Sequence, residues 1–145
     1  MLPEYFEFTL PTKLIYGVGI LKNAGESLGA FGARKAILVS DEVLVDAGLV
    51  EKVIAGLNGS RIEIACTFDK VPPNSTIETV VQCAAMAKKK KCDLFIAVGG
   101  GSVIDTAKVA NLLVVKGGQL QEHMGAYLLD SSERYHEAQH GMAGR

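Results

Sequence analysis

Three consecutive glycines stand at a junction where a backbone can bind an anion. The stretch "DLFIAVGGGSVIDTAK" (93–108) joins an apolar run to a segment with helical spacing through Gly99, Gly100 and Gly101. Glycine lets backbone N–H groups approach a phosphate without a Cβ in the way, and a helix N-terminus carries free N–H groups and partial positive charge. The junction therefore predicts a site for the diphosphate of a dinucleotide. The alternative is an ordinary strand-to-helix turn.

Two polar residues directly after the glycines are candidates for the same site. Ser102 is placed to cap the helix that follows. Asp105 comes three residues later and is placed to complete a capping box. We therefore include both residues with the glycines in the predicted cofactor site.

Two further polar loops are expected at the same edge of a sheet. Asp41 follows the apolar run 35–40, and Asn74 lies in the turn "VPPNST" (71–76) after the alternating run 61–68. A carboxylate at the first position can accept both ribose hydroxyls of NAD, and it repels the 2′-phosphate of NADP. Asn74 can donate hydrogen bonds to a nucleotide. The alternatives are a helix N-cap for Asp41 and turn chemistry for Asn74.

The elements that must position these residues form a repeating strand–helix pattern. The expected strands are 35–40, 61–68 and 93–98, and the expected helices are 20–31, 49–57, one that opens with a Ser75–Glu78 capping box, and 103–115. Repeated strand–helix–strand units predict an α/β fold of Rossmann-like type, with a mostly parallel sheet and helices on both faces. Because the carboxyl ends of parallel strands share one edge, the polar loops are expected to meet there.

The N-terminal segment predicts an additional pair of strands. Residues 5–10 alternate between apolar and polar side chains, and residues 13–17 follow after the turn at Pro11. We expect a hairpin-like pair that precedes the parallel sheet.

Composition excludes several classes of function. The chain has 145 residues and a net charge of −1, so nothing indicates a nucleic-acid or membrane-surface partner. No apolar run approaches the ~20 residues needed to span a bilayer, and the N-terminus lacks the basic start of a secretory signal. Three cysteines, Cys66, Cys83 and Cys92, without a CxxC pair, favour buried thiols in a reducing cytoplasm.

Three other patterns match known motifs but lack their context. "HEAQH" (136–140) matches the zinc-protease signature, yet it lies five residues from the end of the sequence without a third ligand. We interpret it as a chance match, with adventitious zinc or nickel binding as the alternative. The lysines at 88–91 are typical of the last turn of a helix. Gly17 and Gly19 lack the third glycine of a dinucleotide fingerprint, since Lys22 stands there, and are read as a turn.

Four blocks of the sequence resemble one enzyme family. "IYGVG", "LVSDEVLVDAGLVEKV", "VPPNST" and "DLFIAVGGGSVIDTAK" come in the order and spacing of the iron-containing (group III) alcohol dehydrogenases, and the resemblance covers roughly residues 4–129. It implies that Asp41 discriminates NAD from NADP and that Asn74 touches the nucleotide. The residues that it implies for the diphosphate are Gly100, Gly101, Ser102 and Asp105. One departure is "PNST", where members usually read PNPT.

The resemblance also implies what this sequence lacks. Family members are much longer, and a C-terminal helical domain supplies an aspartate and three histidines for iron or zinc. We therefore expect 1–129 to be a dinucleotide-binding domain, 130–145 to be a poorly ordered tail outside the family pattern, and the chain to be a truncated dehydrogenase. In the full enzyme the substrate would be a small alcohol or aldehyde. We expect no turnover by this chain alone and a homodimer or larger assembly. The alternatives are a non-catalytic nucleotide-binding module and a dimerising remnant.

Overall fold

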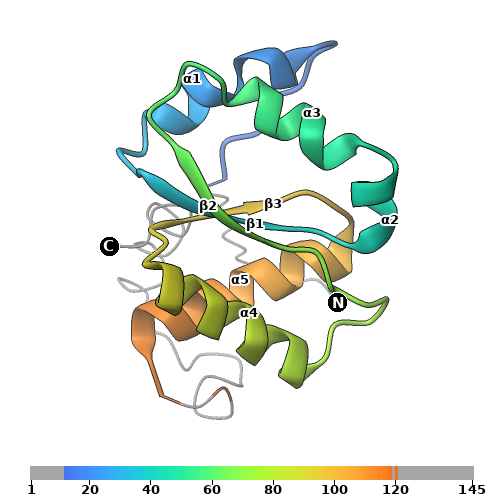
Figure 1. Cartoon of the computed structure of the whole chain (residues 1–145), viewed down its shortest axis with the longest axis vertical. Coiled ribbons are helices and arrows are strands. Elements are labelled where there is room, and N and C mark those ends of the chain that lie inside the picture. Colours follow the sequence, from blue (N-terminus) through green and yellow to red (C-terminus); the bar gives the residue numbers. More distant parts are fainter. Residues whose placement is uncertain (1–11, 119, 121–145) are drawn as a thin grey trace, which may run out of the picture.

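A computed structural model describes residues 12–118 and 120, and its centre is a parallel three-stranded sheet (Figure 1). The strands are β1 (Lys35–Val39), β2 (Glu63–Phe68) and β3 (Leu94–Ala97), in the order β2-β1-β3. Both pairings are parallel, and β1 is the central strand. The predicted α/β class with a parallel sheet is confirmed.

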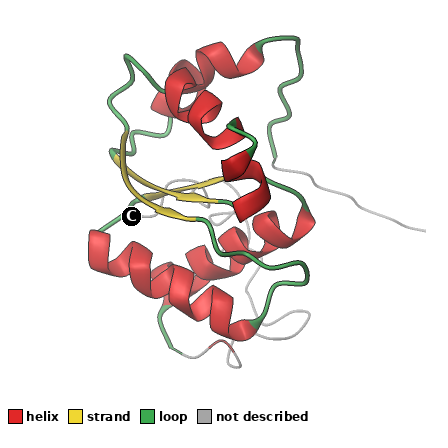
Figure 2. Cartoon of the chain, turned by 45° about the vertical axis from the view of Figure 1, so that its right-hand side comes forward, coloured by secondary structure: helices red, strands yellow, loops and turns green. Residues whose placement is uncertain are grey.

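Helices cover both faces of this sheet (Figure 2). One layer contains the 3-10 helix η1 (Ile20–Asn23), α1 (Ala24–Gly29), α2 (Glu42–Asp46) and α3 (Leu49–Gly56). The other layer contains α4 (Ile77–Lys90) and α5 (Gly101–Lys116), which pack side by side. Within the described ranges, no helix is long and apolar enough to cross a bilayer.

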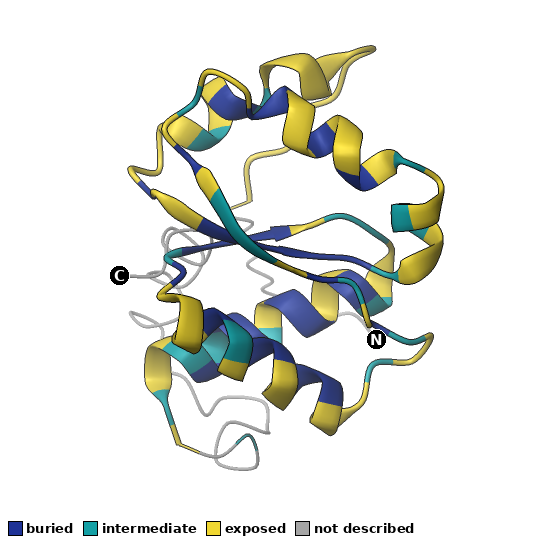
Figure 3. Ribbon diagram, viewed as in Figure 1, coloured by how far each residue is buried: buried dark blue, intermediate teal, exposed yellow. Residues whose placement is uncertain are grey.

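The central strand is buried because a helical layer lies on each side of it (Figure 3). Ile37 and Val39 belong to the apolar cluster on the α4–α5 side, whereas Ala36 belongs to the cluster on the α1–α3 side. All three are fully buried. A strand that is covered on both faces needs apolar residues at every position, which explains the unbroken run that marked β1 in the sequence.

The N-terminal predictions differ from the structure in two ways. The expected helix over 20–31 is split into η1 and α1, because η1 lies directly on α3: a Cβ on Gly56 would collide with the backbone carbonyl of Leu21. Residues 13–17 form no strand, and Leu14 and Tyr16 are exposed, so the predicted second strand is wrong. The predicted strand over 5–10 lies outside the described residues.

Helix α4 begins with a different cap from the one predicted. Thr76, not Ser75, is the N-cap, and its side chain accepts a hydrogen bond from the Thr79 N–H at 3.3 Å. Hydrogen bonds from its own backbone N–H and from Thr76 lower the pKa of the Glu78 carboxyl. The Ser75–Glu78 box is therefore wrong by one residue, and the Ser75 hydroxyl is used elsewhere.

Candidate functional site

The carboxyl ends of the strands open onto a cavity of about 750 Å³. Three loops line it, one after each strand: residues 41–44 after β1, 69–73 after β2, and 100–103 after β3. Asp41, Gly100, Gly101 and Ser102 are thus brought together, as the sequence predicted for this edge. Gly99, Asn74 and Asp105 are not among the residues that line it.

Ser40 ties the three strand ends together at the base of this cavity. Its side chain is fully buried, and its hydroxyl donates to the carbonyl oxygen of Val98 at 2.8 Å. Its backbone N–H donates to the Phe68 carbonyl at 2.8 Å, and its carbonyl accepts from the Val71 N–H at 3.3 Å. Ser40 was not among the residues predicted for the site, although a hydroxyl that ends an apolar run was a usable signal.

The three glycines meet different demands. A Cβ on Gly99 would lie 2.6 Å from Val103 Cγ2, so this glycine is required by packing within the chain. A Cβ on Gly100 or Gly101 would meet nothing within 4 Å. Neither residue has a positive φ, and Gly100 is extended at φ −84° and ψ −165°. Neither contacts nor backbone geometry therefore require glycine at 100 or 101, and a side chain there would project into open space.

The start of α5 lies at the same point. The helix begins at Gly101 with Gly100 as its N-cap, and no side chain caps it. The predicted Ser102–Asp105 capping box is wrong, because the helix starts before Ser102 and leaves Ser102 inside its first turn. The first N–H groups of a helix have no partner within the helix. Here these N–H groups belong to the first turn of α5, whose residues 101–103 line the cavity together with Gly100.

Asp41 serves as a cap and also lines the cavity. It is half-buried, and its Oδ1 accepts a hydrogen bond from the Leu44 N–H at 2.9 Å, which caps α2. A carboxylate has two oxygens and about four acceptor positions, so this single bond leaves capacity for other donors. The two interpretations of Asp41 drawn from the sequence are therefore compatible.

Asn74 connects the loop after β2 to the first turn of α5. Its φ of 62° is in the left-handed region, which non-glycine residues rarely adopt. Its N–H donates to Ser102 Oγ at 3.2 Å. Asp105 is exposed on α5, one turn beyond Gly101. Contact of Asn74 or Asp105 with a nucleotide stays a prediction.

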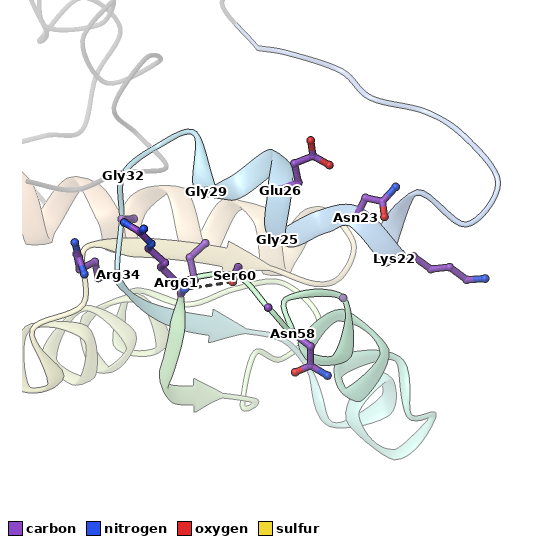
Figure 4. A pocket seen from close by; sticks show the side chains of 14 residues that line it. Lys22, Asn23, Gly25, Glu26, Gly29, Gly32, Arg34, Asn58, Ser60 and Arg61 are labelled. Atoms are coloured by element: carbon purple, nitrogen blue, oxygen red, sulfur yellow. Dashed lines mark hydrogen bonds between the residues drawn. The ribbon is translucent and has the colours of Figure 1, made fainter.

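A second cavity, of about 650 Å³, lies at the opposite edge of the sheet (Figure 4). Lys22, Arg34 and Arg61 lie around it, and all three are exposed. Four of its glycines are accounted for by the fold: Gly32 and Gly59 have positive φ, and Gly25 and Gly56 lie in close contact with other residues. Its fifth glycine, Gly29, meets nothing within 4 Å among the described residues and has no positive φ. The first cavity differs in having two such glycines in succession, at the start of α5.

Comparison with known proteins identifies the family. The model of the family "Iron-containing alcohol dehydrogenase" matches residues 11–139. The chain belongs to the iron-containing alcohol dehydrogenase family. The resemblance drawn from the glycine block and the three loops is confirmed.

Relatives within the iron-containing alcohol dehydrogenases include choline dehydrogenase of Bacillus subtilis (strain 168), which is 35% identical over 123 residues, or 85% of this chain and 30% of that protein. The NAD-dependent methanol dehydrogenase of Bacillus methanolicus is 32% identical over 81% of this chain and 31% of its own length. The solved structure of NADH-dependent butanol dehydrogenase A from Thermotoga maritima superposes with a TM-score of 0.74 at 30% identity. That match covers 82% of this chain and 30% of the other. The chain spans about 30% of the length of these relatives.

The donor set for the family's metal is not found in the part of the chain that the structure describes. No group of three or more His, Cys, Asp or Glu side chains is placed there to hold a metal ion. The histidines at 136–140 lie outside the described residues. We therefore assign no metal-dependent step to residues 12–118 and 120.

Proposed function

We propose that this chain binds NAD(H) at the carboxyl edge of the sheet, as the dinucleotide-binding part of an iron-containing alcohol dehydrogenase. One observation carries the proposal: Gly100 and Gly101 line the cavity, and no contact with a described residue requires either of them to be glycine. A diphosphate does impose that requirement, because its oxygens must approach backbone N–H groups closely.

Each of the other residues of the proposed site can be assigned to one part of a dinucleotide. The diphosphate accepts hydrogen bonds from the N–H groups at the start of α5, with Ser102 and Asp105 beside it and Gly99 shaping the turn. The ribose hydroxyls donate to Asp41, whose charge disfavours the 2′-phosphate of NADP. Asn74 donates to the nucleotide from the loop after β2. These assignments extend the geometry and are open to the test below.

The names of two relatives support this choice of cofactor. The methanol dehydrogenase is NAD-dependent and the butanol dehydrogenase is NADH-dependent. In the whole enzyme we propose a hydride transfer between the nicotinamide and a small alcohol or aldehyde, with iron or zinc supplied by ligands outside the described residues. This chain spans about 30% of its relatives' length, and we propose that its part in that reaction is to bind the cofactor.

Calorimetric titration tests the proposal with four ligands: NADH, NADPH, ADP and ATP. We expect NADH to bind more tightly than NADPH. The Asp41→Asn variant keeps an oxygen that can cap α2 but loses the charge, so the preference should shrink by about 10-fold, the effect of about one hydrogen bond to a charged group. The absence of NADH binding would refute the proposal. Equal binding of ATP and NADH would favour the alternative, a generic nucleotide-binding module.

We also propose that the chain self-associates in the cytoplasm. Leu14, Tyr16 and Val18 are 89%, 94% and 106% exposed, and such a run of uncovered apolar side chains favours a contact with a second copy. The three cysteines are free, which fits a reducing compartment. Light scattering should give a dimer or larger, and a monomer at high concentration would contradict it.

A further inference from the structure

Thr106, on α5, carries a fully buried hydroxyl near the proposed site. Its Oγ1 lies within hydrogen-bond distance of two oxygens, to one of which its single hydroxyl hydrogen can donate. One is the Ser102 carbonyl oxygen, one helical turn earlier, at 2.7 Å. The other is Ser75 Oγ, 31 residues away in sequence, at 2.6 Å. A threonine in a helix commonly bonds the preceding turn, so the contact with Ser75 is the one that needs explanation.

The Ser75 contact joins two loops of the cavity. Asn74, the neighbour of Ser75, donates its N–H to Ser102 Oγ at 3.2 Å. The loop after β2 is thus attached to the first turns of α5 at two successive residues. Because Thr106 also holds the Ser102 carbonyl, both attachments converge on the residue that follows the glycines.

Two features show why this attachment matters for the loop. Asn74 has a φ of 62°, in the left-handed region, which asparagine tolerates better than most residues but which still costs free energy. Asn74 itself is exposed, so few packing contacts hold it in place. The hydrogen bonds at Asn74 and Ser75 therefore help to hold this conformation.

We infer that Ser75 and Thr106 are positioning residues, which fix the 71–76 loop against α5 and thereby raise the affinity for NADH. The inference rests on the proposed function. Neither residue lines the cavity, so they act through Asn74 and Ser102 and not by touching the nucleotide there. The local sequence pattern predicted a helix cap at Ser75 and no role for Thr106.

The test compares NADH affinity, measured by fluorescence titration, among matched variants. Thr106→Val removes the hydroxyl at nearly constant volume and should weaken NADH binding about 5-fold, the effect of roughly one hydrogen bond. Thr106→Ser keeps the hydroxyl and should bind like the unmodified chain. Ser75→Ala should reproduce the loss without touching the core. The double variant should lose no more than Thr106→Val alone, because that change already removes the contact with Ser75.

A control separates positioning from stability. Thr79→Val removes another buried threonine hydroxyl, 3.1 Å from Thr76 Oγ1 at the start of α4, and leaves the hydrogen bonds of Asn74 and Ser75 to α5 in place. It should lower the melting temperature and leave the dissociation constant for NADH unchanged. If Ser75→Ala and the folded Thr106→Val bind NADH as tightly as the unmodified chain does, the inference is wrong while the proposed function stands. If the unmodified chain does not bind NADH, the proposed function fails first.

Discussion

Placing a methyl group at Gly101 should make the protein more stable and a worse cofactor binder. An alanine Cβ at this position meets no atom within 4 Å, and the residue has no positive φ. The fold therefore accepts the methyl group without strain. The same methyl group would occupy space beside residues 100–103, where we place the diphosphate. Stability and affinity should thus change in opposite directions.

The expected change in stability and the expected change in NADH affinity have different physical causes. Gly→Ala at a compatible position stabilises by about 0.4–1 kcal/mol, because the unfolded chain has fewer conformations to lose. For a chain of this size that is a rise of about 2–4 °C in melting temperature. Displacing the diphosphate from one N–H group removes a hydrogen bond to a charged group, about 1.5–3 kcal/mol, or about 10- to 100-fold in affinity.

Gly99 provides the matched control, because its surroundings are opposite in kind. A Cβ there would lie 2.6 Å from Val103 Cγ2, and overpacking of this sort costs about 1–3 kcal/mol. Gly99→Ala should therefore lower the melting temperature, whereas Gly101→Ala raises it. Differential scanning fluorimetry measures the melting temperature of both variants, and titration measures their affinity for NADH. A Gly101→Ala variant that binds NADH normally would refute the assignment of this space to the diphosphate.

Two further changes probe the core beneath the site. Ser40→Ala should cost about 1–3 kcal/mol in urea unfolding, because the Val98 carbonyl loses the donor at 2.8 Å; a change below about 0.5 kcal/mol would show that the bond is dispensable. Burial, followed by the nearby Cys66 and Cys92, raises the pKa of Cys83 to about 12 from its ordinary 9.0. Above pH 9 the unfolded thiol ionises while the folded one keeps its proton, so the stability present below pH 9 should be lost between pH 9 and 12. Urea midpoints at pH 8 and 10.5 measure the loss, and Cys83→Ala should reduce it.

The three strands and the glycine junction were predictable because their sequence patterns lie within short stretches of the chain. The runs 35–40, 61–68 and 93–98 became β1, β2 and β3, with ends that shift by one or two residues. Their apolar continuity reflects burial on both faces, a demand that acts at every position of the strand. The glycine junction was predictable for a related reason, since a strand end, bare backbone and helix start are adjacent in the chain.

The caps were not predictable, because long-range contacts compete for the same hydroxyls. Ser75 and Ser102 both carried a local capping pattern, yet neither caps a helix. The Ser75 hydroxyl lies 2.6 Å from Thr106 Oγ1, and the Ser102 hydroxyl accepts from the Asn74 N–H at 3.2 Å. These partners are 31 and 28 residues away, so no local pattern contains them.

The predicted strand over 13–17 failed for a similar reason. Its composition is typical of a strand, but side chains such as Leu14 and Tyr16 find no apolar layer among the described residues. β-Propensity measures how well a residue fits a half-buried pleated surface, so the pattern alone cannot create a strand where that surface is missing.

The glycine triplet is where the needs of the fold and of the proposed function separate. Alanine favours a helix over glycine by up to about 1 kcal/mol, so stability alone would select a larger residue at the start of α5. At Gly99 a larger residue is excluded because Val103 fills the space beside it, but at Gly101 no described residue excludes one. When a residue lowers the stability of the fold and no contact within the fold compensates for it, the residue is expected to serve binding of a ligand. The open space, the uncapped helix start and the Asp41 carboxylate across the cavity together describe that partner as an anion that also carries hydroxyl groups, which is the chemistry of a dinucleotide.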